Sequence, residues 1–333
     1  MPLKTPSFWY RHASASAPLP EILLGALAVP YQWGHRVNQS MQSAKAKKAP
    51  VPVLCVGNAV AGGSGKTPIA QAIMHLIKKH DIAQTPYFLT RGYKGTLQEP
   101  TLVCPDHHSY AQSGDESLLL AKQAPTVIAT KRIDGAELAA LHGADVIIMD
   151  DGLQHAGLIK DLSFLVIDGQ AGFGNLKTLP AGPLREPLEE AIDKADAFIL
   201  IGKDKRGVTN LLPEQKPLFH AHIEPVQSSL PEKGPIVAFA GLGRPEKFYH
   251  FLQDMGYSIA AWHPFPDHHN YSDDELDALI TQAGALQAKL VTTDKDFMRL
   301  KDHNQAGHVH PVQIRAVFSP ESEISGFLKD RLS

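Results

Sequence analysis

The sequence feature that most constrains the fold is a glycine-rich loop between an apolar strand and a helix. Residues 54–68 read LCVGNAVAGGSGKTP: the apolar residues 54–56 predict a buried strand, and Gly65-Lys66-Thr67 predicts the first turn of a helix. Glycines let successive backbone N–H groups turn toward one anion, and the helix N-terminus adds partial positive charge. The run therefore predicts a phosphate-binding loop in an α/β fold.

This loop departs from the general pattern at one position. The pattern G-x-x-x-x-G-K-[ST] places glycine five residues before Gly65, where this chain has Val60. The later glycines can supply the same flexibility, Lys66 can reach phosphate oxygens, and Thr67 can ligate Mg²⁺. An ordinary glycine-rich turn would not need Lys and Thr together. The expected nucleotide-binding residues are Val60, Ala61, Gly62, Gly63, Ser64, Gly65, Lys66 and Thr67.

The rest of the chain extends the α/β interpretation. It has 333 residues, 43% hydrophobic and 20% charged, which is typical of a folded protein with one large or two smaller domains. Continuously apolar runs such as 146–149 and 164–167 favour parallel strands covered on both faces. We expect a P-loop NTPase-like, mostly parallel sheet with helices on both faces. Its strands are predicted at 51–56, 86–90, 126–129, 145–149, 163–167 and 197–201, and its helices near 67–80, 115–123, 133–142 and 187–194.

A polar stretch at 203–216 interrupts this alternation and favours a hinge between domains. The alternation then resumes in what we expect to be a smaller α/β C-terminal domain. The expected division is a P-loop domain over 41–210 and the smaller domain over 211–333. In the latter, strands are predicted at 236–240, 258–262, 289–292 and 312–317, and helices near 245–255 and 272–286.

The N-terminal segment has its own character. Residues 1–50 carry a net charge of +5, against −8 for the remainder. The apolar run 22–29 lies among aromatic residues, including Trp9, Tyr10, Tyr31 and Trp33, and is much shorter than the roughly 20 residues that span a bilayer. We expect 1–40 to be a helical segment that associates with anionic membranes. The alternative is a helix packed on its own protein. The two cysteines, at 55 and 104, favour a reducing compartment.

Two adjacent carboxylates follow a buried strand. In the run VIIMDDGLQH, Asp150 and Asp151 come directly after apolar residues 146–149, at the strand end where ligands of open α/β sheets bind. Carboxylates at this position can hold Mg²⁺ opposite the Thr67 hydroxyl. Asp168 ends the next strand in a similar way, but without a partner motif it is interpreted as part of a turn.

Two further clusters could carry chemistry. Asp115 follows Ser-Gly before an apolar helical run, where a carboxylate commonly caps a helix. The run 262–271, WHPFPDHHNY, places three histidines and an aspartate in a proline-rich aromatic loop. It could be a metal site, an acid–base site or an ordinary surface loop. Because no cysteine lies nearby to complete a zinc set, acid–base work is favoured.

Seven motifs follow one another along the chain, namely VGN at 56–58, GGSGKTP at 62–68, TRGY at 90–93, GDE at 114–116, DDGLQH at 150–155, LPAGPLREP at 179–187 and FPDHH at 265–269. In this order they resemble the tetraacyldisaccharide 4'-kinase family of lipid A biosynthesis. The resemblance implies ATP- and Mg²⁺-dependent phosphorylation of the 4'-hydroxyl of a tetraacylated glucosamine disaccharide 1-phosphate in lipopolysaccharide biosynthesis. It also implies a peripheral or monotopic enzyme at the cytoplasmic face of a Gram-negative inner membrane, without a nucleic acid partner. The family fold is a P-loop kinase domain hinged to a smaller domain that closes over the active site.

The resemblance also implies roles for individual residues. Asp115 matches the catalytic base and His268 its partner across the cleft, with His268 preferred to His269 because it directly follows Asp267. Lys66 completes the catalytic set, and Arg132 is expected to meet a substrate phosphate. The residues expected at the metal are Thr67, Asp150, Asp151 and Glu186.

Two other function classes can be weighed against a kinase. A switch ATPase of the partition or metallochaperone type has a similar deviant loop, but the partition ATPases place a second lysine just before the Gly-Gly pair, where this chain has Ala61. A nonenzymatic, membrane-associated nucleotide-binding module would explain the loop and the N-terminus. It would leave Asp115 and His268 without a role.

Overall fold

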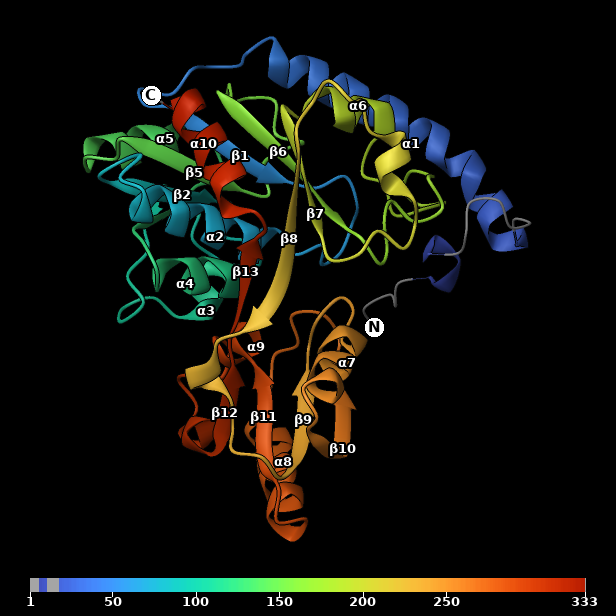
Figure 1. Ribbon diagram of the computed structural model, residues 1–333, viewed down its shortest axis with the longest axis vertical. Coiled ribbons are helices and arrows are strands. Elements are labelled where there is room, and N and C mark those ends of the chain that lie inside the picture. Colours follow the sequence, from blue (N-terminus) through green and yellow to red (C-terminus); the bar gives the residue numbers. More distant parts are fainter. Residues whose placement is uncertain (1–5, 11–17, 333) are drawn as a thin grey trace.

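The computed structural model describes residues 6–10 and 18–332, and these form a nine-stranded and a four-stranded sheet (Figure 1). The large sheet has the order β13-β8-β7-β6-β1-β5-β2-β4-β3. Its edge strands β3 and β13 run antiparallel to their neighbours, and the other pairs are parallel. The smaller sheet, β10-β9-β11-β12, is parallel throughout. The expected α/β class, with a second smaller sheet, is confirmed.

The strands of the large sheet are β1 (Val53–Gly57), β2 (Pro86–Thr90), β3 (Thr101–Leu102), β4 (Thr126–Ile128), β5 (Val146–Asp150), β6 (Leu162–Asp168), β7 (Ala197–Ile201), β8 (Leu218–Pro225) and β13 (Ile314–Phe318). Those of the smaller sheet are β9 (Pro235–Ala240), β10 (Ser258–Pro264), β11 (Lys289–Thr293) and β12 (Val309–Val312).

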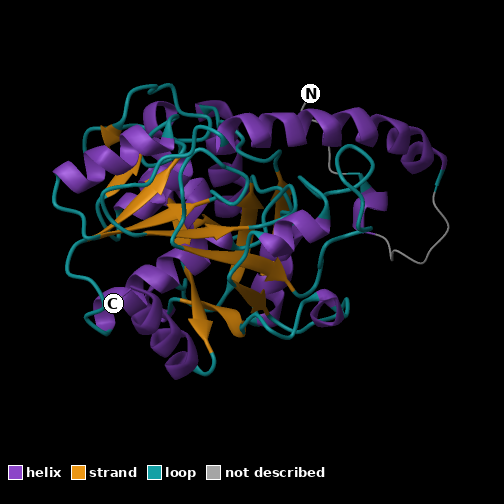
Figure 2. Ribbon diagram, turned by 90° about the horizontal axis from the view of Figure 1, so that it is seen from above, coloured by secondary structure: helices purple, strands orange, loops and turns teal. Residues whose placement is uncertain are grey.

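The α-helices are α1 (Leu19–Ser43), α2 (Lys66–Lys79), α3 (Tyr110–Ser113), α4 (Asp115–Ala121), α5 (Arg132–Leu141), α6 (Leu188–Asp193), α7 (Glu246–Asp254), α8 (Asp273–Ala285), α9 (Asp294–Phe297) and α10 (Glu321–Leu332). Short 3₁₀ helices are η1 (Ser7–Tyr10), η2 (Val208–Leu211), η3 (Gln227–Ser229) and η4 (Asn304–His308). Figure 2 shows helices on both sides of the strands.

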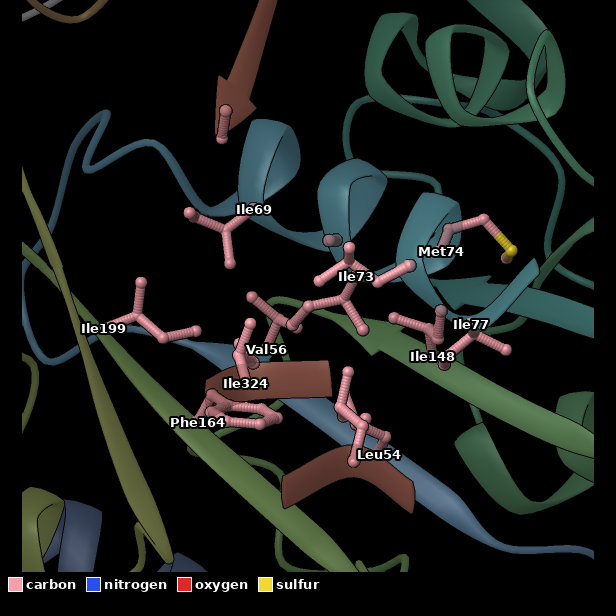
Figure 3. Packing of buried hydrophobic residues seen from close by; sticks show 14 of the residues in the cluster. Leu54, Val56, Ile69, Ile73, Met74, Ile77, Ile148, Phe164, Ile199 and Ile324 are labelled. Atoms are coloured by element: carbon pink, nitrogen blue, oxygen red, sulfur yellow. The ribbon is translucent and has the colours of Figure 1, made fainter. Parts of the chain in front are cut away.

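Alternating side chains of the central strand divide the core into two layers. Leu54 and Val56 of β1 pack with α2 and α10 on one face of the sheet, as Figure 3 shows for Ile73 and Ile324. The intervening Val53 and Cys55 pack with α5 on the other face. Because successive side chains of a strand point to opposite faces, a strand covered on both sides must be apolar throughout. This packing fixes the start of α2, and hence the phosphate loop, at the end of β1.

The chain crosses from the large sheet to the smaller one after β8 and returns before β13. The two crossing segments contact each other, because Val226 N–H donates to Gln313 O at 2.9 Å and Gln313 N–H donates to Ser229 Oγ at 2.9 Å. The predicted cut at residue 210 instead falls between β7 and β8, which are neighbours in one sheet. The polar stretch 203–216 is thus a surface connection, in which Asp204 accepts the Val208 N–H at 3.0 Å.

The expected strand at 312–317 proves to be two strands in different sheets. Val312 ends β12 in the smaller sheet and Ile314 begins β13 in the large one, where it pairs with β8. The apolar pattern runs through both, so the sequence did not show the change of sheet. Strand β8 and helix α10 were not predicted.

Helix α1 lies along the outside of the large-sheet half of the molecule, beside α6 (Figure 1). It includes Pro30 and is much longer than the apolar run at 22–29. Parts of the predicted 1–40 segment, at 1–5 and 11–17, lie outside the described residues, as does residue 333 at the C-terminal end. Within the described residues, no helix combines the length and apolar character needed to cross a membrane.

Candidate active site

The loop between β1 and α2 has the backbone of an anion cradle. Gly62 and Gly65 adopt φ values of +103° and +85°, which favour glycine over residues with a Cβ atom. The amide of Asn58 ties the loop together by donating to Val60 O and Ser64 Oγ, both at 2.7 Å. Among the described residues, the N–H groups of Gly62, Gly63 and Ser64 donate no hydrogen bond. These donors are available to a bound phosphate.

The two adjacent aspartates meet the end of this loop. The Thr67 hydroxyl donates to Asp150 Oδ2 at 2.9 Å, and Lys66 Nζ lies 3.5 Å from Asp151 Oδ1. Arg185 also pairs with Asp151, at 2.8 Å. The carboxylates predicted opposite the Thr67 hydroxyl do lie beside the loop, because β1 and β5 are parallel neighbours that end at the same edge of the sheet.

The two carboxylates differ in charge environment. Burial raises the pKa of Asp150 to about 7, and the charges of Glu116 and Asp151 add to this effect more than Lys66 offsets it. Burial also opposes ionisation of Asp151, but the adjacent Lys66 and Arg185 outweigh it and hold that pKa at about 2. Asp151 is therefore an anion at neutral pH, whereas Asp150 is only partly ionised there, and a bound cation would favour its ionised form.

One carboxylate oxygen of the site has an unsatisfied lone pair that suits a divalent cation. Asp150 Oδ1 is buried and has no hydrogen-bond partner among the described residues. A buried carboxylate oxygen without a partner costs free energy unless a cation satisfies it. Carboxylate and hydroxyl oxygens are also the donors that Mg²⁺ prefers, so Asp150 and Thr67 fit such an ion.

Glu186 is not brought into contact with this group. Its fully buried side chain pairs with Lys194, lies 3.3 Å from His35 Nε2 and accepts from Gln154 Nε2 at 2.9 Å. It reaches the aspartates only through a chain, because Arg185 donates both to Gln154 Oε1 at 3.3 Å and to Asp151. His35, Glu186 and Glu190 are close enough to share a cation, but Lys194 and Arg36 already pair with these carboxylates.

Asp115 and His268 meet across the gap between the two sheets. His268 Nδ1 lies 2.9 Å from Asp115 Oδ2, although 153 residues separate them. Asp115 is 3% exposed, on the first turn of α4, and His268 follows β10 with a left-handed φ of +56°. That conformation is costly in a residue with a Cβ atom, and it turns the ring toward Asp115. The structure thus pairs His268 with Asp115, whereas His269 contacts Glu275 at 3.0 Å.

Two cations of the smaller sheet complete this pair. Arg299 Nε lies 3.3 Å from Asp115 Oδ2, and Lys295 Nζ lies 3.5 Å from His268 Nε2 and 2.8 Å from Glu116 Oε1. Burial alone would raise the pKa of Asp115. The hydrogen bond with His268 and the charges of Lys295 and Arg299 outweigh burial and lower this pKa to about 2.

Arg132 lies at the start of α5 and is 5% exposed. Its Nη1 donates to Ala129 O, while its buried Nε has no hydrogen-bond partner among the described residues. Burial and the nearby Arg91 lower its pKa to about 10. His155 lies in the same cationic region, and its pKa falls to about 4 through burial and the charges of Arg132, Lys160 and Arg91. The region suits an anionic group.

Sequence reasoning missed three charged residues of the site, Arg185, Lys295 and Arg299. Arg185 lies within one of the motifs quoted above and could have been singled out there. Lys295 and Arg299 follow β11 in the run TTDKDFMRL, and no local pattern distinguishes them from surface cations. Only the approach of the smaller sheet brings them to Asp115.

Comparisons with known proteins agree with this geometry. The family model described as Tetraacyldisaccharide-1-P 4'-kinase matches residues 21–333. A protein named Tetraacyldisaccharide 4'-kinase from Paramagnetospirillum magneticum is 44% identical over 300 residues, covering 90% of each chain. One of the same name from a Bradyrhizobium species is 39% identical over 345 residues, covering 99% of this chain and 98% of its own.

A solved structure gives the same result. The chain is similar to LpxK from Aquifex aeolicus, crystallised as an "apo" form in complex with ATP, with a TM-score of 0.75 and 28% identity. The match covers 95% of this chain and 100% of that one. These findings do not favour the switch-ATPase alternative. The chain belongs to the tetraacyldisaccharide 4'-kinase family.

Proposed function

We propose that this chain transfers the terminal phosphoryl group of ATP to the 4'-hydroxyl of a tetraacyldisaccharide 1-phosphate in lipid A biosynthesis. The observation that supports this most directly is the Asp115–His268 pair, held at 2.9 Å between the phosphate loop and the smaller sheet. A kinase needs a proton acceptor opposite the phosphate cradle. A switch ATPase or a binding module has no use for such a pair.

The reaction follows from these positions. The phosphate loop and Lys66 hold the phosphates of ATP, and the acceptor hydroxyl lies against Asp115. A bond forms between the 4'-oxygen and the γ-phosphorus while the bond from that phosphorus to the bridging oxygen of ADP breaks. Asp115, ionised and oriented by His268, accepts the hydroxyl proton as the phosphoryl group arrives.

Mg²⁺ would be held by Thr67, Asp150 and Asp151, and it would neutralise charge that develops on the phosphate oxygens. Glu186 supports this set through Gln154 and Arg185 rather than by direct ligation. Arg132, with its unsatisfied buried Nε, would meet a phosphate of the lipid substrate.

Phosphate transfer from labelled ATP to a tetraacyldisaccharide 1-phosphate tests the proposal. The wild-type protein should label the lipid, and Lys66→Ala and Thr67→Ala should abolish transfer because they remove phosphate and metal contacts. Exposed Lys289, paired with Glu232 at 2.8 Å, offers the control Lys289→Ala, which should stay active. ATP hydrolysis without lipid labelling would contradict the proposal and favour the switch-ATPase function instead.

We also propose that α1 attaches the protein to a membrane surface, at the cytoplasmic face of the inner membrane. Some of its polar side chains contact the protein: Tyr31 donates to Arg185 O at 2.9 Å and the partly exposed Arg36 pairs with Glu190 at 2.8 Å. Its large apolar side chains face outward, which suits burial in an interfacial layer. These exposed residues are Leu19, Ile22, Leu23, Leu27, Val29, Trp33, Val37 and Met41.

Flotation with anionic phospholipid vesicles tests the attachment. The double variant Leu23→Ser/Leu27→Ser should lower the partition coefficient by about 10²- to 10⁴-fold, because each of the two leucines contributes about 1.5–3 kcal/mol when buried in lipid. Leu141 on α5 is 82% exposed and far from α1 in the chain, so Leu141→Ser is a matched control. Unchanged partitioning of the double variant would favour the alternative that α1 only packs against the rest of the protein.

A further inference from the structure

Asp168 ends β6 beside the phosphate loop and holds two cations from the smaller domain. Arg244 and Lys247, one just before α7 and one on it, both pair with its Oδ2. From the sequence alone, Asp168 is predicted to belong to a turn. The structure instead makes it a contact between the two halves of the molecule, with a side chain only 8% exposed. Figure 1 shows α7 in the smaller half, near the large one.

The same two cations touch the phosphate loop itself. Arg244 Nη2 lies 3.1 Å from Gly63 O, and Lys247 Nζ lies 3.4 Å from it. The preceding backbone is equally close, because a Cβ atom placed on Gly243 would lie 3.7 Å from Gly63 N. The segment 243–247 therefore lies directly against the stretch of loop whose N–H groups are available to phosphate.

The charges of Asp168, Arg244 and Lys247 do not cancel. One carboxylate faces two cations, and the guanidinium of Arg244 also lies 5.3 Å from the ring centre of Tyr10. A net positive charge thus remains next to a loop built for an anion, where a phosphate would gain charge-assisted hydrogen bonds.

The position of this cluster indicates which phosphate it serves. His268 N–H donates to Gly241 O at 3.1 Å, so the segment that carries Arg244 also supports the residue that orients Asp115. The transferred phosphate must lie between the loop and Asp115 if the function proposed above is right. Cations presented from that side face the γ-phosphate end of ATP.

We propose that Arg244 and Lys247 bind the γ-phosphate of ATP from the smaller domain, with Asp168 as the positioning residue that aims them. The loop supplies the neutral N–H donors and Lys66 from one side, and the smaller domain supplies two charges from the other. Nucleotide with a third phosphate thereby ties the two domains together, whereas ADP lacks the group that these cations contact. This inference rests on the proposed kinase function.

Binding titrations with two nucleotides test it, using Mg²⁺ with the β,γ-imido analogue of ATP or with ADP. Arg244→Ala and Lys247→Ala should each weaken the analogue by about tenfold, the loss typical of one charge-assisted hydrogen bond, and weaken ADP by less than about threefold. Asp168→Asn should show the same selectivity with a smaller loss. Arg244→Lys should recover part of the affinity. Equal losses for both nucleotides, or none, would overturn the inference.

Controls separate folding from binding. Lys289→Ala removes an exposed cation of the same smaller domain and should bind both nucleotides as the wild type does. Thermal unfolding of each variant without nucleotide shows whether it is folded. If the wild type fails to label the lipid while the selectivity for the analogue persists, only the proposed function fails. If it labels the lipid and the selectivity is absent, only this inference fails.

Discussion

Two regions of the active site each bury an aspartate, yet the two carboxyl groups behave in opposite ways. Asp150, at the end of β5, is 2% exposed and Asp115, at the start of α4, is 3% exposed. Burial raises the pKa of Asp150 to about 7, whereas the hydrogen bond with His268 and the nearby cations lower that of Asp115 to about 2 despite burial. Equal burial therefore does not give equal charge.

The difference lies in where the neighbours come from. Asp150 is surrounded by the large sheet, where Lys66 is its nearby cation and Glu116 and Asp151 repel it. Asp115 faces the smaller domain, which supplies His268, Lys295 and Arg299. One buried oxygen of Asp150 has no hydrogen-bond partner among the described residues, whereas Asp115 is already an anion at neutral pH. This contrast suits a metal ligand in one place and a proton acceptor in the other.

The largest expected effect concerns the proton acceptor. Asp115→Ala should lower kcat by about 10²–10⁴-fold, or about 3–5 kcal/mol, with little change in ATP affinity. His268→Ala should resemble it. The double variant should lose less than the product of the two factors, because residues that act as one unit are not additive. Steady-state kinetics on the three variants measures this.

Melting temperatures supply the counter-test. If Asp115 only caps α4, Asp115→Ala should cost about 0.5–2 kcal/mol of stability and leave turnover per folded molecule intact. Fully multiplicative losses would show that Asp115 and His268 work independently.

The next effect concerns Asp150. Its replacement should raise the free energy of unfolding, whereas most replacements of buried residues lower it. Because its folded pKa lies above the ordinary value, the folded state binds the extra proton, and its contribution makes stability fall as pH rises from about 4 to 7. Without metal, Asp150→Asn should therefore raise the free energy of unfolding by about 2–4 kcal/mol at pH 8 and by less than about 1 kcal/mol at pH 4. Denaturant unfolding at both pH values measures the difference.

Added metal and nucleotide should reduce or reverse the stability advantage of Asp150→Asn over the wild type. Mg²⁺ with the ATP analogue should stabilise the wild type more than Asp150→Asn, since the variant lacks one carboxylate for the ion. If Asp150→Asn gave the same gain in stability over wild type at pH 4 and at pH 8, the raised pKa of Asp150 would be wrong.

The smallest effect concerns Lys295, 3.5 Å from His268 and 2.8 Å from Glu116. Lys295→Met should cost about 1–2 kcal/mol at pH 7, the size of one hydrogen bond to a charged group. Since Asp115 has a lowered pKa, its stabilising contribution is complete above about pH 4 and is lost as pH falls toward 2. The variant should lose less over that window, because its Asp115 pKa lies nearer the ordinary value.

Unfolding curves between pH 2 and pH 7 measure this loss, with Lys289→Met as the exposed control. Parallel curves for Lys295→Met and wild type would mean that Lys295 does not lower the pKa of Asp115.

The sequence alone determined the parts of the protein that depend on neighbours in the chain. The apolar strand, the glycines and Gly65-Lys66-Thr67 predicted the phosphate loop, since a loop that must expose N–H groups needs those residues in that order. Continuous apolar runs predicted parallel strands, because strands covered on both faces have no polar side. The ordered motifs identified the family and, with it, the pair Asp115 and His268.

Tertiary structure decided what distant segments contribute. No local pattern could show that β12 and β13 belong to different sheets, because apolar residues alternate with polar ones from Val312 into β13 without a turn signal. Nor could it show that Lys295 and Arg299 reach Asp115, that Glu186 faces Lys194 instead of the aspartates, or that Asp168 holds Arg244 and Lys247. Periodicity reports which side of an element is buried, while charge pairing depends on which elements meet. That meeting is fixed only when the two sheets pack together.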